Sequence, residues 1–102
     1  MELKPGSRWK SAVCDTEVVV VRATTGDISL ECGGHPMVAH SAPKPAGLAL
    51  DEDHAKGTAP GKRFADDVTG LEVLATKGGK GSLSIGGREI GAKEAKKLPA
   101  SD

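Results

Sequence analysis

The sequence predicts a small, mainly β domain made of two β-hairpins joined by a long irregular connector. Three observations predict this fold class. Four consecutive valines at residues 18–21 favour extended structure, because branched Cβ atoms restrict χ1 and pack well on a pleated surface. Glycine-containing turns follow apolar segments in both halves of the chain. A segment of the first half is also echoed in the second half, as in proteins built from repeated units.

Composition limits the function classes. A chain of 102 residues predicts one small domain with a modest core. Trp9 and Phe64 are the only aromatic residues and 14 residues are glycine, so a bound metal ion or a partner chain would add needed stability. The 14 basic and 14 acidic residues balance without a basic block, which argues against binding nucleic acid or an anionic membrane.

The sequence also predicts a cytoplasmic location. No apolar run approaches the roughly 20 residues of a membrane span, and the N-terminal residues lack the apolar core of a signal peptide. In that compartment, two cysteines are expected to be thiols or metal ligands rather than a structural disulfide.

The first hairpin is expected at about residues 13–38. Its strands are predicted at 17–23 and 28–32, and its turn at 24–27, where Gly26 can adopt a positive φ angle. Residues 1–10 are expected to be irregular, because Pro5 and Gly6 interrupt any regular element. Trp9 is predicted to cover an edge of the core or, alternatively, to be an exposed aromatic for a ligand or partner.

Residues 39–66 are rich in proline, glycine and alanine and are predicted to be a connector, a lid or an arm that wraps a neighbour. The second hairpin follows at about residues 67–91, with strands at 71–75 and 82–85 and a turn at 76–81. The tail, 92–102, is expected to hold a short helical segment at 92–98, which Pro99 ends.

The internal echo aligns residues 23–37 with residues 75–90. With one inserted residue in the second turn, seven of fifteen aligned positions are identical. The second copy carries Ile85 in place of Cys32 and Arg88 in place of His35. The echo therefore predicts two repeated units, of which only the first has the residues of a site.

Cys14, Cys32 and His35 are the candidate metal ligands. Two thiolates and an imidazole suit zinc, and less exclusively iron or copper. Cys32 and His35 flank a Gly-Gly turn, and hairpin pairing would bring Cys14 to the same end. The fourth position would be filled by water, by His40 or Asp15, or by a second chain.

Two other functions remain open. The chain could be a small enzyme, although no motif identifies its small-molecule substrate. Its site would be either an open Cys-Cys-His zinc site that activates a carbonyl or a bound water, or a nucleophile at Cys14 or Cys32 with His35 as base, and residues 39–66 would be the lid. The chain could instead be an interaction module without metal, which offers a sheet edge to a partner protein. In the module, the cysteines would be small core residues.

The stretch 14–38 resembles the desulforedoxin domain. In that family a Cys-x-x-Cys pair precedes two strands joined by a glycine turn, and an adjacent Cys-Cys pair, a glycine and a methionine follow them. The four thiolates hold one iron, and the domain forms a homodimer. Cys14, Cys32 and Met37 match this pattern, whereas Ser11 and Gly33 stand where the family has its other two cysteines. The resemblance implies a single zinc or iron ion in an altered site, and either a homodimer or a fused pseudo-dimer with one degenerate half.

Overall fold

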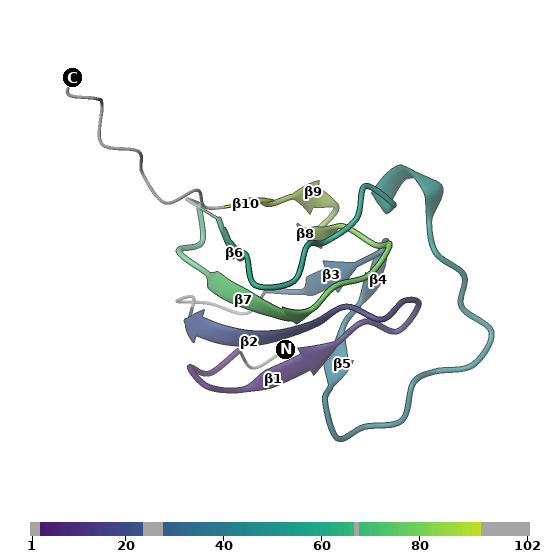
Figure 1. Ribbon diagram of the computed structural model, residues 1–102, viewed down its shortest axis with the longest axis horizontal. Coiled ribbons are helices and arrows are strands. Elements are labelled where there is room, and N and C mark those ends of the chain that lie inside the picture. The colour runs from purple at the N-terminus through teal and green to yellow at the C-terminus, as the bar shows by residue number, and fades with distance from the viewer. Residues whose placement is uncertain (1–2, 24–27, 67, 93–102) are drawn as a thin grey trace.

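The computed structural model describes residues 3–23, 28–66 and 68–92 and confirms a mainly β fold. It contains short antiparallel strands and one 3-10 helix, η1, at Glu52–His54 (Figure 1). The strands are β1 Arg8–Lys10, β2 Glu17–Arg22, β3 Leu30–Cys32, β4 His35–Pro36, β5 Val38–Ala39, β6 Arg63–Ala65, β7 Glu72–Lys77, β8 Leu83–Ile85, β9 Arg88–Glu89 and β10 Gly91–Ala92.

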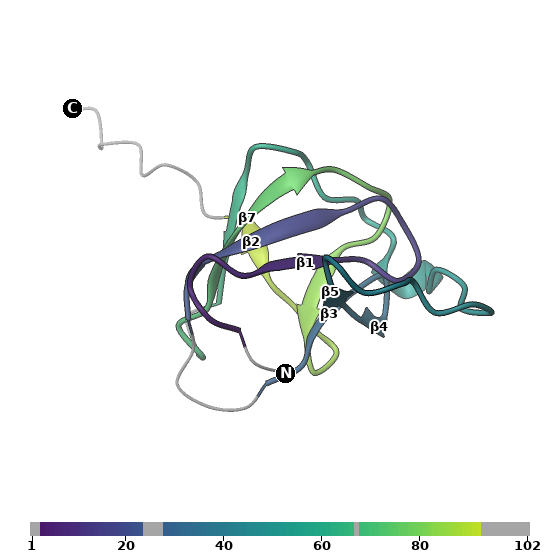
Figure 2. The ribbon, with the colours of Figure 1, turned by 90° about the horizontal axis from the view of Figure 1, so that it is seen from below.

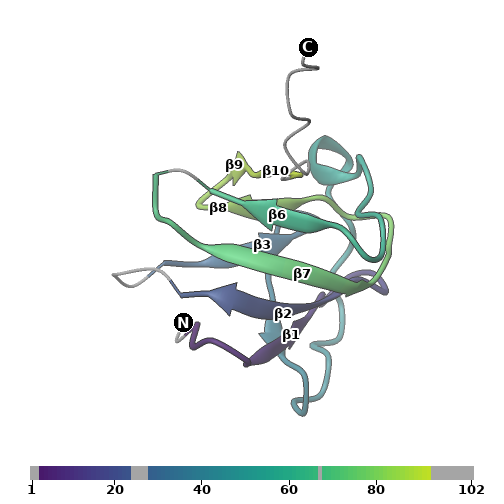
Figure 3. The same cartoon turned by 60° about the vertical axis from the view of Figure 1, so that its left-hand side comes forward.

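These strands form two sheets. The six-stranded sheet has the order β10-β6-β7-β2-β1-β5, and the four-stranded sheet has the order β4-β3-β8-β9. Figure 3 shows β6, β7, β2 and β1 side by side in that order, and Figure 2 shows β3 in a separate layer from β2 and β7. Residues from both sheets form one buried cluster, so the sheets pack on each other through their inner faces.

Strands β6–β10 repeat the arrangement of β1–β5. When the corresponding strands are matched, each sheet has the same order read from either edge. Trp9 pairs with Val18 in the first repeat, and Phe64 pairs with Val73 in the second. The edge strands repeat the same register, since Ala39 lies opposite Trp9 as Ala92 lies opposite Phe64. We call residues 8–39 the first repeat and residues 63–92 the second repeat. The internal duplication therefore extends well beyond the echo visible in the sequence.

The strand pairing within the two predicted hairpins is wrong. Strand β2 does not pair with β3 but with β1 and β7, and β8 does not pair with β7 but with β3 and β9. The chain crosses from one sheet to the other between β2 and β3, and again between β7 and β8. Each sheet is consequently centred on a pair of matching strands, one from each repeat. The observed local hairpins are β1–β2, β3–β4 and their counterparts β6–β7 and β8–β9.

Several predicted boundaries also change. Strand β1 lies in the segment expected to be irregular, although Trp9 packs against the core edge as expected. Strand β6 lies inside the predicted connector, so the second repeat begins earlier than residue 67. Strand β7 runs into the turn predicted at 76–81, and Ala92 belongs to β10 rather than to a helix. The predicted turn 24–27 and the remainder of the predicted helix, 93–98, lie outside the described residues.

The connector between β5 and β6 is attached to both repeats. The Asp51 amide donates to the Gly33 carbonyl at 3.0 Å, and the Ser82 amide donates to the His54 carbonyl at 2.8 Å. Thr58 forms an isolated bridge with Gly79. These contacts place the connector beside the Gly33–Gly34 turn, where it forms one wall of the site. No described helix is long and apolar enough to cross a membrane.

Candidate functional site

The structure brings Cys14 and Cys32 together, with their Sγ atoms 3.8 Å apart. Cys14 lies in the loop between β1 and β2, and Cys32 ends β3. Since these strands belong to different sheets, the pair forms where the loop of the six-stranded sheet meets the end of the four-stranded sheet. Both cysteines are free thiols; Cys32 is fully buried and Cys14 is half-buried.

Ser11 organises the loop that carries Cys14. Its amide donates to the Thr16 carbonyl at 2.8 Å and closes the loop. Its hydroxyl accepts hydrogen bonds from the amides of Val13 and Cys14, each at 3.1 Å. This local turn needs only a short side-chain acceptor at its first position, which serine supplies.

The pKa values of the two thiols are shifted in opposite directions. Burial raises the pKa of Cys14, but hydrogen bonds from the Ser11 and Thr16 hydroxyls and the backbone of Thr16 and Gly81 outweigh it and lower that pKa to about 7. The Cys14 Sγ and the Thr16 Oγ1 are 3.3 Å apart. Burial, together with the nearby charge of Cys14, raises the pKa of Cys32 to about 12. Cys14 is therefore the thiol that ionises near neutral pH.

His35, the third predicted ligand, is held by the connector. It lies opposite Cys32 in the β3–β4 pair, but its Nε2 is hydrogen-bonded to the Ala49 carbonyl at 2.8 Å. Of the suggested fourth ligands, His40 bonds Glu17 at 3.0 Å and Asp15 is exposed. Across residues 3–23, 28–66 and 68–92, the structure contains no group of three or more His, Cys, Asp or Glu side chains arranged to hold a metal ion.

The four-sulfur centre of the desulforedoxin family does not fit these residues. Gly33, at one of the family's cysteine positions, has a φ of +67°. A Cβ there would lie 2.5 Å from the Leu50 Cδ1 and 2.6 Å from the Val13 Cγ2. The space that a third thiol would need is thus filled by the connector and the Cys14 loop. Ser11, at the other position, uses its hydroxyl to hold the loop.

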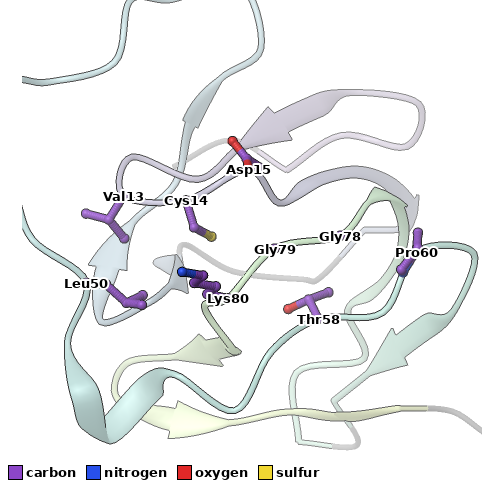
Figure 4. Close-up of a pocket in the computed structure, with 9 residues that line it drawn as sticks. All are labelled: Val13, Cys14, Asp15, Leu50, Thr58, Pro60, Gly78, Gly79 and Lys80. Carbon is purple, nitrogen blue, oxygen red and sulfur yellow. The ribbon is translucent and has the colours of Figure 1, made fainter.

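A pocket of about 630 Å³ opens beside Cys14. Figure 4 shows the Cys14 sulfur pointing into it and the Asp15 carboxylate pointing away. Both repeats and the connector contribute to the lining, which consists of Val13, Cys14, Asp15, Leu50, Thr58, Pro60, Gly78, Gly79 and Lys80. The Lys44 Nζ lies close by and donates to the Cys14 carbonyl at 2.7 Å.

Sequence reasoning missed the residues that surround the thiols. Ser11 and Thr16 could have been found from the short polar loop around Cys14, in which serine precedes the cysteine by three positions. Gly81 and Lys80 could not, because only the pairing of β3 with β8 brings the second repeat to this site. A Cβ on Gly81 would lie 3.0 Å from the Cys32 Sγ, so glycine allows this close approach.

Comparisons with protein-family models, curated proteins and solved structures found no match to this chain. Its function is therefore inferred from the geometry of the site.

Proposed function

We propose that this protein is a small thiol–disulfide exchange protein in which Cys14 is the attacking thiol and Cys32 the resolving thiol. One observation carries the proposal: the two Sγ atoms are 3.8 Å apart, and only the Cys14 sulfur opens into a pocket. A reactive cysteine next to a buried resolving cysteine is the usual arrangement for reversible oxidation.

The reaction has two balanced steps. The Cys14 thiolate attacks one sulfur of a substrate disulfide, forms a mixed disulfide and releases the first substrate thiolate. Cys32 then loses its proton to solvent or to that departing thiolate and attacks the Cys14 sulfur. This second attack forms the Cys14–Cys32 disulfide and releases the second substrate thiol. Two protein thiols are oxidised and one substrate disulfide is reduced.

The environments of the thiols favour this order. With a pKa of about 7, Cys14 is substantially ionised at neutral pH, whereas Cys32 stays protonated. When Cys14 enters the mixed disulfide it loses its negative charge, which removes one of the causes that raise the pKa of Cys32. The resolving thiol is thus activated by the first step. The reduced form would prevail in the cytoplasm, which remains the location we propose.

A second candidate is binding of a single zinc or iron ion by Cys14 and Cys32, which would have a structural or accessory role. A tetrahedral ion with metal–sulfur bonds of about 2.3 Å separates its sulfur ligands by about 3.8 Å. The observed Sγ–Sγ separation of 3.8 Å supports this candidate. Two thiolates leave two coordination positions, which His35 after release from Ala49, a second copy of the chain or a partner protein would fill.

Mass spectrometry of the reduced protein with a small disulfide tests the proposal. We expect the wild type to lose two hydrogens as the intramolecular disulfide forms. Cys32→Ser should accumulate the mixed disulfide, and Cys14→Ser should react slowly with the reagent. A wild type that retains both thiols under these conditions would exclude thiol–disulfide exchange.

Elemental analysis of protein purified without added metal separates the two candidates. We expect less than about a tenth of an equivalent of transition metal, with rapid alkylation of Cys14 rising with pH around a midpoint near 7. Near-stoichiometric zinc or iron, together with thiols protected from alkylation until a chelator is added, would favour metal binding instead.

A further inference from the structure

We propose that the substrate is a small-molecule disulfide that carries a carboxylate or another anionic group, which Lys80 and Lys44 bind beside Cys14. This inference rests on the proposed thiol–disulfide exchange and specifies the substrate class. It is carried by the charges around the pocket and by the pocket's size and lining.

The charges around Cys14 favour an anion. Lys80 is exposed and lines the pocket, and the Lys44 Nζ lies 2.7 Å from the Cys14 carbonyl oxygen. In the described part of the chain, neither ammonium group forms an ion pair with a carboxylate. Asp15 is the only acidic residue in the lining, and its carboxylate points away from the pocket (Figure 4). Lys80 therefore places a cation without a carboxylate partner in the lining of the pocket, and Lys44 places a second one at the backbone of Cys14.

The shape of the pocket favours a small molecule. Its volume of about 630 Å³ is within the range of roughly 300–1,000 Å³ that small-ligand sites usually have. Val13, Leu50 and Pro60 offer apolar contacts for the body of a ligand. Gly78 and Gly79, which lie on the same side as Pro60, add no side chains to the lining. A ligand could thus place its disulfide at Cys14, its carbon chain on these apolar side chains and its anionic group at the lysines.

Reagents that differ in charge test this inference. The dianionic disulfide 5,5′-dithiobis(2-nitrobenzoate), the neutral 4,4′-dithiodipyridine and the dicationic cystamine are reacted with reduced protein, and each rate is divided by that of a small free thiol. We expect the normalised rate for the dianion to exceed that for the dication about threefold to tenfold at low salt, with the preference declining as salt is added. Electrostatic attraction is the only property of the site expected to give this salt dependence.

Matched lysine variants locate the effect. Lys80→Ala should lower the rate with the dianion about threefold relative to the rate of the same variant with the neutral reagent, and Lys80→Glu should reverse the charge preference. Lys44→Ala is expected to have a similar but smaller effect. Lys62→Ala removes an exposed lysine that does not line the pocket, and it should leave all three rates unchanged.

The possible failures are distinguishable. Equal normalised rates for the three reagents, or a Lys80→Glu protein with the wild-type charge preference, would overturn the inference while leaving the exchange reaction intact. If Lys62→Ala lowers the rate as much as Lys80→Ala, general surface charge is responsible and the assigned site is wrong. If no reagent converts the thiols to the Cys14–Cys32 disulfide, the proposed function itself fails.

Discussion

The two repeats carry loops that are closed by matching hydrogen bonds, but the first repeat has a pair of thiols beside its loop and the second repeat has an ion pair between Asp66 and Arg88. The loop between β1 and β2 is closed by the Ser11 amide and the Thr16 carbonyl at 2.8 Å. Its counterpart between β6 and β7 is closed by the Asp66 amide and the Leu71 carbonyl at 2.9 Å. The positions of Cys14 and Cys32 are taken in the second repeat by Thr69 and Ile85. One backbone arrangement thus supports two different sets of side chains.

The first residue of the loop accounts for much of the difference. In the second repeat the buried Asp66 carboxylate accepts hydrogen bonds from Arg88, and from the amide and hydroxyl of Thr69 at 3.0 and 2.7 Å. In the first repeat the neutral Ser11 hydroxyl holds the loop and leaves Cys14 open to the pocket. The comparison indicates that the second repeat uses this position for an ion pair, and the first repeat uses it to hold the loop that places Cys14 at the pocket.

Separating the repeats is expected to have the largest effect. A chain that ends near residue 40 would lose β7 and β8, the partners of β2 and β3 in the centres of the two sheets. Since isolated hairpins are marginal in water, this fragment should be unfolded as a monomer or should form a dimer that replaces the second repeat. Circular dichroism and analytical ultracentrifugation measure both properties. A cooperatively folded monomer would show that the pairing between repeats is not needed for folding.

The sequence predicted strands better than it predicted their partners. The valines of β2 identify a strand through local conformational preference, and the glycine turns identify the echo between β3 and β8. Pairing of β2 with β7 depends on contacts between residues far apart in the sequence, for which one sequence gives no local signal. The proximity of Cys14 and Cys32 was predicted, although from a hairpin that the structure lacks. The pocket was not predicted, because the second repeat and the connector build most of it.

Removing the carboxylate from the second repeat should have the next largest effect. Asp66→Ala leaves the hydrogen-bond donors of Arg88 and Thr69 without their acceptor and is expected to lower the free energy of unfolding by about 1–3 kcal/mol. Urea denaturation near pH 7 gives this value. Ser11→Ala is the matched change in the first repeat and should cost less, because it removes a neutral acceptor.

The pH dependence identifies the carboxylate as the cause. Hydrogen bonds from Arg88 hold the pKa of Asp66 well below its usual range. A depressed folded-state pKa stabilises the protein fully above the unfolded pKa of about 3.9, and this contribution is lost as the pH falls toward the folded value. The stability difference between wild type and Asp66→Ala should therefore shrink in acid below about pH 4. A difference that stays constant down to pH 2 would assign the effect to packing rather than charge.

The two cysteines should differ in their contribution to stability. Cys32→Ser places a hydroxyl at a fully buried position and is expected to cost about 1–3 kcal/mol, whereas Cys14→Ser, at a half-buried position, should cost less than about 1 kcal/mol. Urea denaturation under reducing conditions measures both.

A chelator should leave the melting temperature of the wild type unchanged if the thiols are redox groups. A chelator-induced decrease that is absent from Cys32→Ser would indicate a structural metal.

The smallest effect is expected from making the first repeat resemble the second at its aromatic residue. Trp9 occupies the place of Phe64, and its Nε1 donates to the Ser7 Oγ at 3.1 Å. Trp9→Phe keeps a ring against Val18 but removes this partly exposed hydrogen bond, so the expected cost is about 0.5–1 kcal/mol. Circular dichroism should follow the denaturation, because Trp9 is the only tryptophan and its fluorescence would be lost. Ser7→Ala removes the acceptor, so in that background Trp9→Phe should hardly lower the free energy of unfolding further. If Trp9→Phe still lowers it there by the same amount, the packing of the larger ring, and not the hydrogen bond, distinguishes the two aromatic residues.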